Sequence, residues 1–194
     1  MVAPIILFTY RRAAHTRRCV ESIKISPLAA ESILYIFSDA AKGATDVADV
    51  QEVRDYIKTI TGFKNVLVEE APENRGLANS VIYGVGKVLE EHGRAIVLED
   101  DLVLSPYFLS YMNEALEMYK DEEDVININS HILTSPMTFS DNFLISFANS
   151  WGWATWKRGW QYFEPDAEKL LAKIESEGRE REFDMGYHFT RMLR

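Results

Sequence analysis

The chain has 194 residues, of which 47% are hydrophobic, 12% aromatic and 26% charged, a globular composition that excludes disordered, collagen-like and coiled-coil proteins. Its 21 basic and 30 acidic side chains give a formal net charge of −9, which argues against nucleic acid as a partner held through phosphate contacts. The single cysteine, Cys19, cannot form an internal disulfide or a zinc cluster.

The length of the chain and its first residues predict the number of domains and the compartment. At ~150 residues per domain, the length predicts one domain over residues 1–194. No apolar run approaches the ~20 residues that a helix needs to cross a bilayer. The first residues place apolar side chains before the charges, the reverse of a signal peptide. We therefore expect a cytoplasmic protein without a transmembrane segment.

Apolar runs alternate with amphipathic segments in the first 120 residues. We predict strands over residues 5–9, 33–37, 66–68 and 94–98, and helices over residues 16–23, 47–60, 78–89 and 106–119. A fifth strand is predicted over residues 125–128. Four such alternations indicate an α/β fold, with a mostly parallel central sheet and helices on both faces.

The second part of the chain breaks this rhythm. A strand is expected over residues 143–147 and a charged helix over residues 167–177. Between them Trp156, Trp160 and Phe163 have helical spacing, which is more typical of a core than of a ligand site. We predict a nucleotide-binding half, residues 1–128, followed by a smaller, irregular half, residues 129–194, that completes the same domain. The second half ends inside a continuing helix, so part of it is expected to lie beyond this chain.

Each predicted parallel strand ends in polar residues. These are Thr9–Arg12, Ser38 and Asp39, Glu73–Gly76, and Glu99–Asp101. Ligands of open α/β sheets bind beyond the carboxyl ends of the strands, so these four sets should meet at one site. Neither a G-x-G-x-x-G motif after the first strand nor a phosphate-binding P-loop motif is present, which disfavours dinucleotide oxidoreductases and P-loop enzymes.

The acidic run Glu99–Asp101 follows a buried strand directly. Like charges at such short range repel and raise one another's pKa, and a divalent cation removes that cost. Mg²⁺ and Mn²⁺ commonly use one or two carboxylates together with substrate phosphate oxygens. The run therefore predicts a Mn²⁺ or Mg²⁺ site. The alternative is a solvated acidic turn, or an acidic set at a helix N-terminus.

Five ordered motifs carry a resemblance: LFTYRR, YIFSDA, ENRGLANS, AIVLEDDLVLSPYFLSYM and NSWGWATWKRGW. Together they resemble nucleotide-sugar glycosyltransferases of the GT-A fold, namely bacterial family-two-like sugar transferases and, more distantly, N-acetylglucosaminyltransferase I. The resemblance implies transfer from a nucleotide-sugar donor, UDP-linked, to a glycan or other hydroxyl acceptor, with inversion, as in polysaccharide biosynthesis. It implies a hexosyl- or N-acetylhexosaminyltransferase.

The resemblance also implies site residues. Asp101 matches the metal ligand of the family, and Asp39 matches the acid that accepts from the uracil N–H. The full set of implied nucleotide-sugar contacts is Thr9, Arg12, Asp39, Arg75, Asn79, Glu99, Asp100, Gly152 and Trp153. Arg11 stands where the family usually has asparagine. For Asp39 the alternative is a cap or turn residue. At Gly152 the backbone could approach a ligand, and the Trp153 indole could stack on a sugar.

An inverting transferase needs a general base. Asp184, in the E-F-D stretch, resembles the acid that follows the aromatic segment in related enzymes, and Glu164 and Asp166 are reserves.

The rival hypothesis is a non-catalytic module that binds a sugar nucleotide or a glycan. A receiver-type domain would need acidic residues after the first strand, where this chain has arginines. A glycosidase would need two separated carboxylates, which adjacent Asp100 and Asp101 do not supply.

Overall fold

The computed structural model describes residues 2–131, 142–184 and 188–194. It divides into two compact units, Met1–Trp160 and Gln161–Arg194. The boundary lies after Trp160 and not near residue 128, because the elements that follow residue 128 complete the sheet of the first unit. No helix of the described chain is long and apolar enough to span a bilayer.

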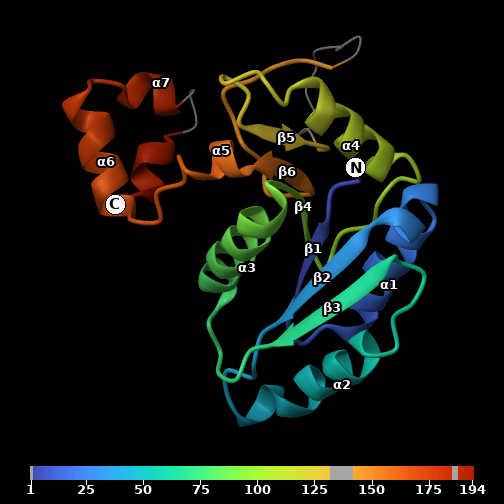
Figure 1. Ribbon diagram of the computed structural model, residues 1–194. Coiled ribbons are helices and arrows are strands. Elements are labelled where there is room, and N and C mark those ends of the chain that lie inside the picture. Colours follow the sequence, from blue (N-terminus) through green and yellow to red (C-terminus); the bar gives the residue numbers. More distant parts are fainter. Residues whose placement is uncertain (1, 132–141, 185–187) are drawn as a thin grey trace. The chain divides into compact units, whose positions relative to one another are not determined.

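The first unit is built on a sheet of six strands in the order β3-β2-β1-β4-β6-β5 (Figure 1). The strands are β1 (Ile5–Thr9), β2 (Ile33–Ser38), β3 (Asn65–Glu70), β4 (Arg94–Glu99), β5 (Asn127–Asn129) and β6 (Trp153–Trp156). The first four run parallel, and β6 is antiparallel to both β4 and β5. The predicted mostly parallel sheet is therefore confirmed.

Helices cover both faces of this sheet (Figure 1). They are α1 (Ala13–Lys24), α2 (Val47–Ile57), α3 (Leu77–His92), α4 (Phe108–Met118) and the single turn α5 (Lys157–Trp160), with short 3₁₀ turns at Pro27–Glu31 and Ala44–Asp46. Successive strand residues point to opposite faces. Ile5 and Leu7 accordingly share a core with α1, α2 and α4, whereas Ile6 and Phe8 share a second core with α3.

Helix α3 approaches the sheet closely at Gly84. A Cβ atom there would lie 2.8 Å from the Phe8 ring and 2.9 Å from the Phe37 ring, so only glycine allows this packing distance. The contact matters for function because α3 begins at Leu77, directly after the loop that forms part of the site described below.

The second unit contains α6 (Ala167–Ser176), α7 (Glu180–Asp184) and a 3₁₀ turn at Phe189–Met192. The predicted charged helix over residues 167–177 is confirmed as α6. Asp166 is its N-cap, since its side chain accepts from the backbone N of Lys169 at 3.0 Å.

Two expectations for the aromatic region are wrong. Residues 142–150 form no strand, and Leu144 and Ile145 of the expected strand are exposed. Trp156, expected to share one helix with Trp160 and Phe163, is the last residue of β6 instead, because the segment Trp153–Trp156 pairs with β4 and buries Ala154 completely. Trp156 lies in the core as expected, but Phe163 is 47% exposed because it follows the end of α5.

Candidate functional site

The polar ends of the parallel strands meet in one cavity of about 410 Å³. Its lining includes Thr9–Arg12 after β1, Asp39 after β2, Asn74 and Gly76 before α3, and Glu99 and Asp100 at the end of β4. The volume lies within the range of small-molecule sites. The predicted convergence at the carboxyl edge of the sheet is therefore confirmed.

Asp39 organises the loop that precedes α3. It is 8% exposed. Its Oδ1 accepts from the backbone N–H groups of Ala40 and Arg75, each at 2.9 Å. Its Oδ2 accepts from the Gly76 N–H at 2.9 Å and from the Asn74 amide at 3.1 Å. Four donors thus tie the loop at residues 74–76 to the end of β2. Asp39 therefore holds a turn, which is the alternative role that the sequence offered for it.

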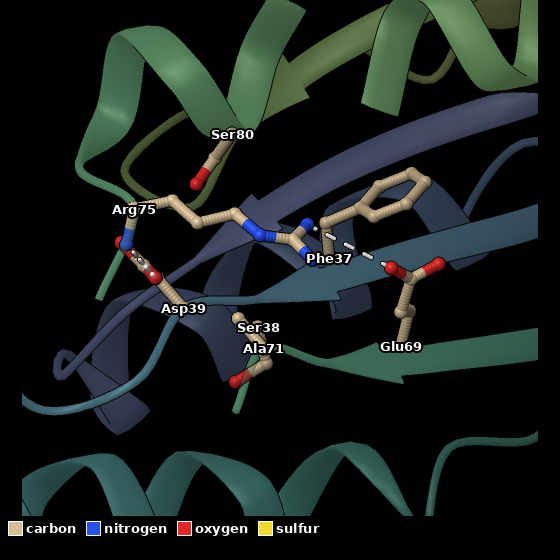
Figure 2. A pocket seen from close by; sticks show the side chains of 7 residues that line it. All are labelled: Phe37, Ser38, Asp39, Glu69, Ala71, Arg75 and Ser80. Atoms are coloured by element: carbon tan, nitrogen blue, oxygen red, sulfur yellow. Dashed lines mark hydrogen bonds and ion pairs between the residues drawn. The ribbon is translucent and has the colours of Figure 1, made fainter. Parts of the chain in front are cut away.

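Arg75 lies across a smaller recess beside this loop, as Figure 2 shows. The recess is lined by Phe37, Ser38, Asp39, Glu69, Ala71, Arg75 and Ser80. The Arg75 guanidinium lies 3.7 Å from a Glu69 oxygen and 4.2 Å from the centre of the Tyr83 ring. Although burial opposes it, hydrogen bonding from Lys87 and Tyr83 keeps the pKa of Glu69 below its usual value. Arg75 therefore stays paired with an ionised partner.

Asn79 has a supporting position. Its side-chain amide donates to the Arg75 carbonyl at 2.9 Å, which stabilises the turn into α3. It does not line the described cavity.

Thr9, in contrast, lines the cavity and is 4% exposed, and its hydroxyl has no partner among the described residues. A buried hydroxyl of this kind is available to a ligand or to water.

Arg12 bridges the acidic run. Its guanidinium pairs with the buried carboxylate of Asp100, and its second nitrogen lies 3.2 Å from the Asp101 carboxylate. The Thr16 hydroxyl donates to Asp100 at 3.4 Å. Burial raises the pKa of Asp100, an effect that Arg12 opposes. Burial and the charges of Asp101 and Asp100 raise the pKa of Glu99. The run is thus only partly neutralised by the protein.

The carboxylates of the acidic run differ in how far they could serve a metal ion. Among the described residues no three His, Cys, Asp or Glu side chains are grouped closely enough to hold a metal. The side chain of Asp101 is 43% exposed, whereas that of Asp100 is 4% exposed. The chain therefore presents one partly exposed carboxylate, that of Asp101, whose Oδ2 contacts Arg12. This fits Mn²⁺ or Mg²⁺ whose other ligands come from substrate phosphates and water.

Tyr10, Arg11 and Asn74 line the cavity as the convergence of the strand ends predicts, whereas Lys42 lines it without having been predicted. The Tyr10 hydroxyl donates to Asp46 at 2.7 Å, and Arg11 pairs with the same carboxylate at 2.6 Å. The Lys42 backbone N–H donates to Tyr10 at 3.0 Å. These contacts tie the loop after β2 to the end of β1. The arginine-rich start of the sequence was the available signal, but its acidic partner could not be read from spacing.

Gly152 and Trp153 do not line the described cavity. Gly152 has φ +72°, and a Cβ atom there would lie 2.9 Å from the Ser130 hydroxyl, so packing alone accounts for the glycine. The Trp153 ring stacks on Trp160 at 5.8 Å between centroids, and both pack against the core shared with α3.

The candidate bases lie in the second unit. Both carboxylate oxygens of Asp184 accept from Thr190, one from its backbone N–H at 2.7 Å and one from its hydroxyl at 3.2 Å. The backbone hydrogen bond from Thr190 lowers the pKa of Asp184. Glu164 pairs with Lys169 and Asp166 caps α6.

The model of the GNT-I family matches residues 1–167, whereas no curated protein matches the chain. Similar solved structures include the mannosyltransferase PcManGT from Pyrobaculum calidifontis in complex with GDP-Man and Mn²⁺, with 16% identity and a TM-score of 0.48 over 65% of this chain and 34% of that one. They also include S. aureus TarS, with 14% identity and a TM-score of 0.45 over 62% of this chain and 20% of that one. TarS 1–349 has 15% identity and a TM-score of 0.45 over 71% of this chain and 39% of that one.

Proposed function

Because the chain belongs to the GNT-I family, we propose that it transfers a sugar from a UDP-linked donor to a hydroxyl group of a glycan or other acceptor, with inversion and with Mn²⁺ or Mg²⁺. The expected membership of a glycosyltransferase family of the GT-A fold is confirmed. The chain covers 20–39% of the three similar structures. The donor, acceptor, metal and mechanism are therefore proposed from this chain's own residues.

One observation carries the proposal. The cavity at the carboxyl edge of the sheet combines the cations Arg11, Arg12 and Lys42 with the carboxylates of Asp39, Glu99 and Asp100. Asp101 is not part of the lining, but it pairs with Arg12, which is. Cations attract a diphosphate, and the partly exposed carboxylate of Asp101 suits a metal that also contacts the diphosphate. When bound, the metal would neutralise charge on the leaving diphosphate.

In this proposal Asp39 receives the uracil ring. The Asn74 amide, at 3.1 Å, is the longest of the four donors to Asp39 and the only one from a side chain. A uracil N–H can take the place of this amide without releasing the backbone N–H groups of the loop. Thr9 and Arg75, at the two sides of Asp39, are proposed to contact the nucleotide as well.

Asp184 is the proposed general base, with Glu164 and Asp166 as reserves. A base that takes a proton from an acceptor hydroxyl must be ionised at the working pH. The hydrogen bonds from Thr190 favour the ionised form of Asp184, as the lowered pKa indicates. They also hold the carboxylate in one orientation.

The direct test is a thermal-shift panel of UDP-, GDP- and ADP-sugars, each with and without Mn²⁺. A ligand at 100 times its Kd should stabilise the fold by ~2.7 kcal/mol. We expect stabilisation by UDP-sugars in Mn²⁺ and less without the metal. Stabilisation by none of the nucleotides would contradict the proposal, and binding without any sugar transfer would favour the non-catalytic module.

Asp39→Ala should weaken UDP binding by ~10-fold or more, since a buried hydrogen bond left unmade costs ~1–3 kcal/mol. The loss should be greater for UDP than for ADP, because only uracil offers the ring N–H. Asn74→Ala is the matched control: it removes the amide that contacts Asp39 and the Ala40 carbonyl but keeps the Asp39 carboxylate. Calorimetry of both nucleotides measures the difference. Equal losses for UDP and ADP would make Asp39 a loop anchor only.

A further inference from the structure

The four tryptophans of the chain differ in what they contact. Trp153 and Trp160 stack on each other. Trp156 is 6% exposed, and its indole N–H donates to the Leu116 carbonyl at 3.2 Å. Trp151 is 52% exposed. The three others are thus used in packing, whereas Trp151 presents a large aromatic surface to solvent.

The backbone around Trp151 is held by side chains. The Trp151 N–H donates to the Asn149 side chain at 2.9 Å, and the Asn149 N–H donates to the Asn129 side chain at 3.0 Å. The Ser130 hydroxyl contacts the Trp151 carbonyl at 3.4 Å and the Gly152 carbonyl at 3.0 Å. Because its backbone is held in this way, the exposed Trp151 loses little main-chain entropy when its indole is used in binding.

Polar side chains lie beside Trp151, one against its ring and two at its backbone. The His131 ring lies 4.8 Å from the Trp151 ring between centroids, tilted by 51°. Asn149 and Ser130 belong to the frame that holds the tryptophan. A pyranose has an apolar face of C–H groups and a rim of hydroxyls. The combination of an aromatic face with amide, hydroxyl and imidazole groups matches both parts of such a ring.

The topology places Trp151 at the same edge of the sheet as the nucleotide cavity. Trp153 pairs with Val97 in the antiparallel ladder of β6 and β4, so Trp151 lies two residues nearer the end of β4 at which Glu99 lines the cavity. The sheet order puts β1 and β2 on one side of β4, and β6 and β5 on the other. The cavity thus lies over the ends of β1, β2 and β4, and Trp151 on the opposite side of β4.

From these observations we infer that Trp151 is the acceptor platform, whose indole stacks on the pyranose ring of the acceptor glycan. The inference rests on the proposed function, because it takes the nucleotide to occupy the cavity on the other side of β4. A donor in that cavity would direct its sugar toward β4. An acceptor on Trp151 would then meet the donor at the end of the sheet where Glu99 and Asp101 lie.

The test uses the whole chain labelled with 5-fluorotryptophan, which gives one ¹⁹F resonance for each of the four indoles. Trp151→Phe identifies the resonance of Trp151 by its absence. The protein is first saturated with UDP and Mn²⁺, and methyl β-pyranosides of glucose, galactose and N-acetylglucosamine are then added. We expect at least one glycoside to shift the Trp151 resonance while Trp156 and Trp160 stay unchanged.

The kinetic counterpart compares Trp151→Ala with Trp151→Phe. We expect alanine to raise the acceptor KM by about tenfold, equivalent to ~1.4 kcal/mol, with UDP affinity unchanged, and phenylalanine to restore part of the loss. A Trp151 resonance that no glycoside moves, while UDP still binds, would overturn the inference alone. A shift with a UDP-sugar but with no glycoside would assign the platform to the donor sugar. Absence of UDP binding would instead overturn the proposed function.

Discussion

Asp101→Asn should abolish the effect of Mn²⁺ on UDP binding. Asp101 is the one carboxylate of the Glu99–Asp101 run with a substantially exposed side chain, 43%, and the described residues offer no cluster of three metal-binding side chains to replace it. Loss of a supporting residue around a metal costs ~10- to 100-fold in affinity. Loss of a direct anionic ligand should cost at least ~100-fold.

Without metal, Asp101→Asn should not weaken the binding of UDP. The Asp101 carboxylate then only repels the diphosphate, so Asp101→Asn should bind UDP no more weakly than the unmodified protein in the presence of a chelator. Calorimetry of UDP with Mn²⁺ and with chelator measures both. Asp121→Asn, an exposed acid in the turn after α4, is the matched control for net charge. Unchanged UDP affinity of Asp101→Asn in Mn²⁺ would refute the metal role.

Asp184→Asn should reduce sugar transfer by ~10²- to 10⁴-fold, the usual contribution of general acid–base catalysis. Asparagine keeps an oxygen that accepts from the Thr190 N–H, and the Thr190 hydroxyl can rotate to accept from the new amide. The local fold should therefore survive. Since the pKa of Asp184 is lowered, the base stays ionised near neutral pH. Its contribution to the rate should be lost only as the pH falls through that lowered value.

The measurement is the transfer rate at saturating donor, taken beside a UDP binding curve for the same variant. Glu164→Gln and Asp166→Asn are the matched carboxylate controls. Turnover near that of the unmodified protein for Asp184→Asn would reject it as the base and pass the role to whichever control loses activity. Lost UDP binding would show that Asp184 supports the nucleotide site instead.

The sequence by itself determined the fold class and the edge of the sheet that carries the site. Runs such as residues 5–9 and 94–98 are apolar at nearly every position, which requires strands buried on both faces and hence helices on both faces of a parallel sheet. In such a sheet the carboxyl ends of the parallel strands share one edge. The meeting of Thr9, Asp39 and Glu99 in one cavity followed from that geometry alone.

Only the tertiary structure decided which groups face one another at that edge. Arg12 and Asp100 are 88 residues apart in sequence, and no local pattern shows that they pair. The choice of residues 153–156 over residues 143–147 as the partner of β4 likewise depends on which segment fits that edge of the sheet. Both segments are apolar and short, and such runs do not reveal their pairing.

Pairing between distant segments also explains why neighbouring tryptophans differ in exposure. Trp151 and Trp153 are two residues apart, yet one is half exposed and the other stacks on Trp160. Composition favours an aromatic sugar contact in this segment, but the pairing of β6 with β4 and the packing against α3 partly bury Trp153 and leave Trp151 at the surface. Side-chain exposure is set by contacts between distant parts of the chain, and these exist only in the folded protein.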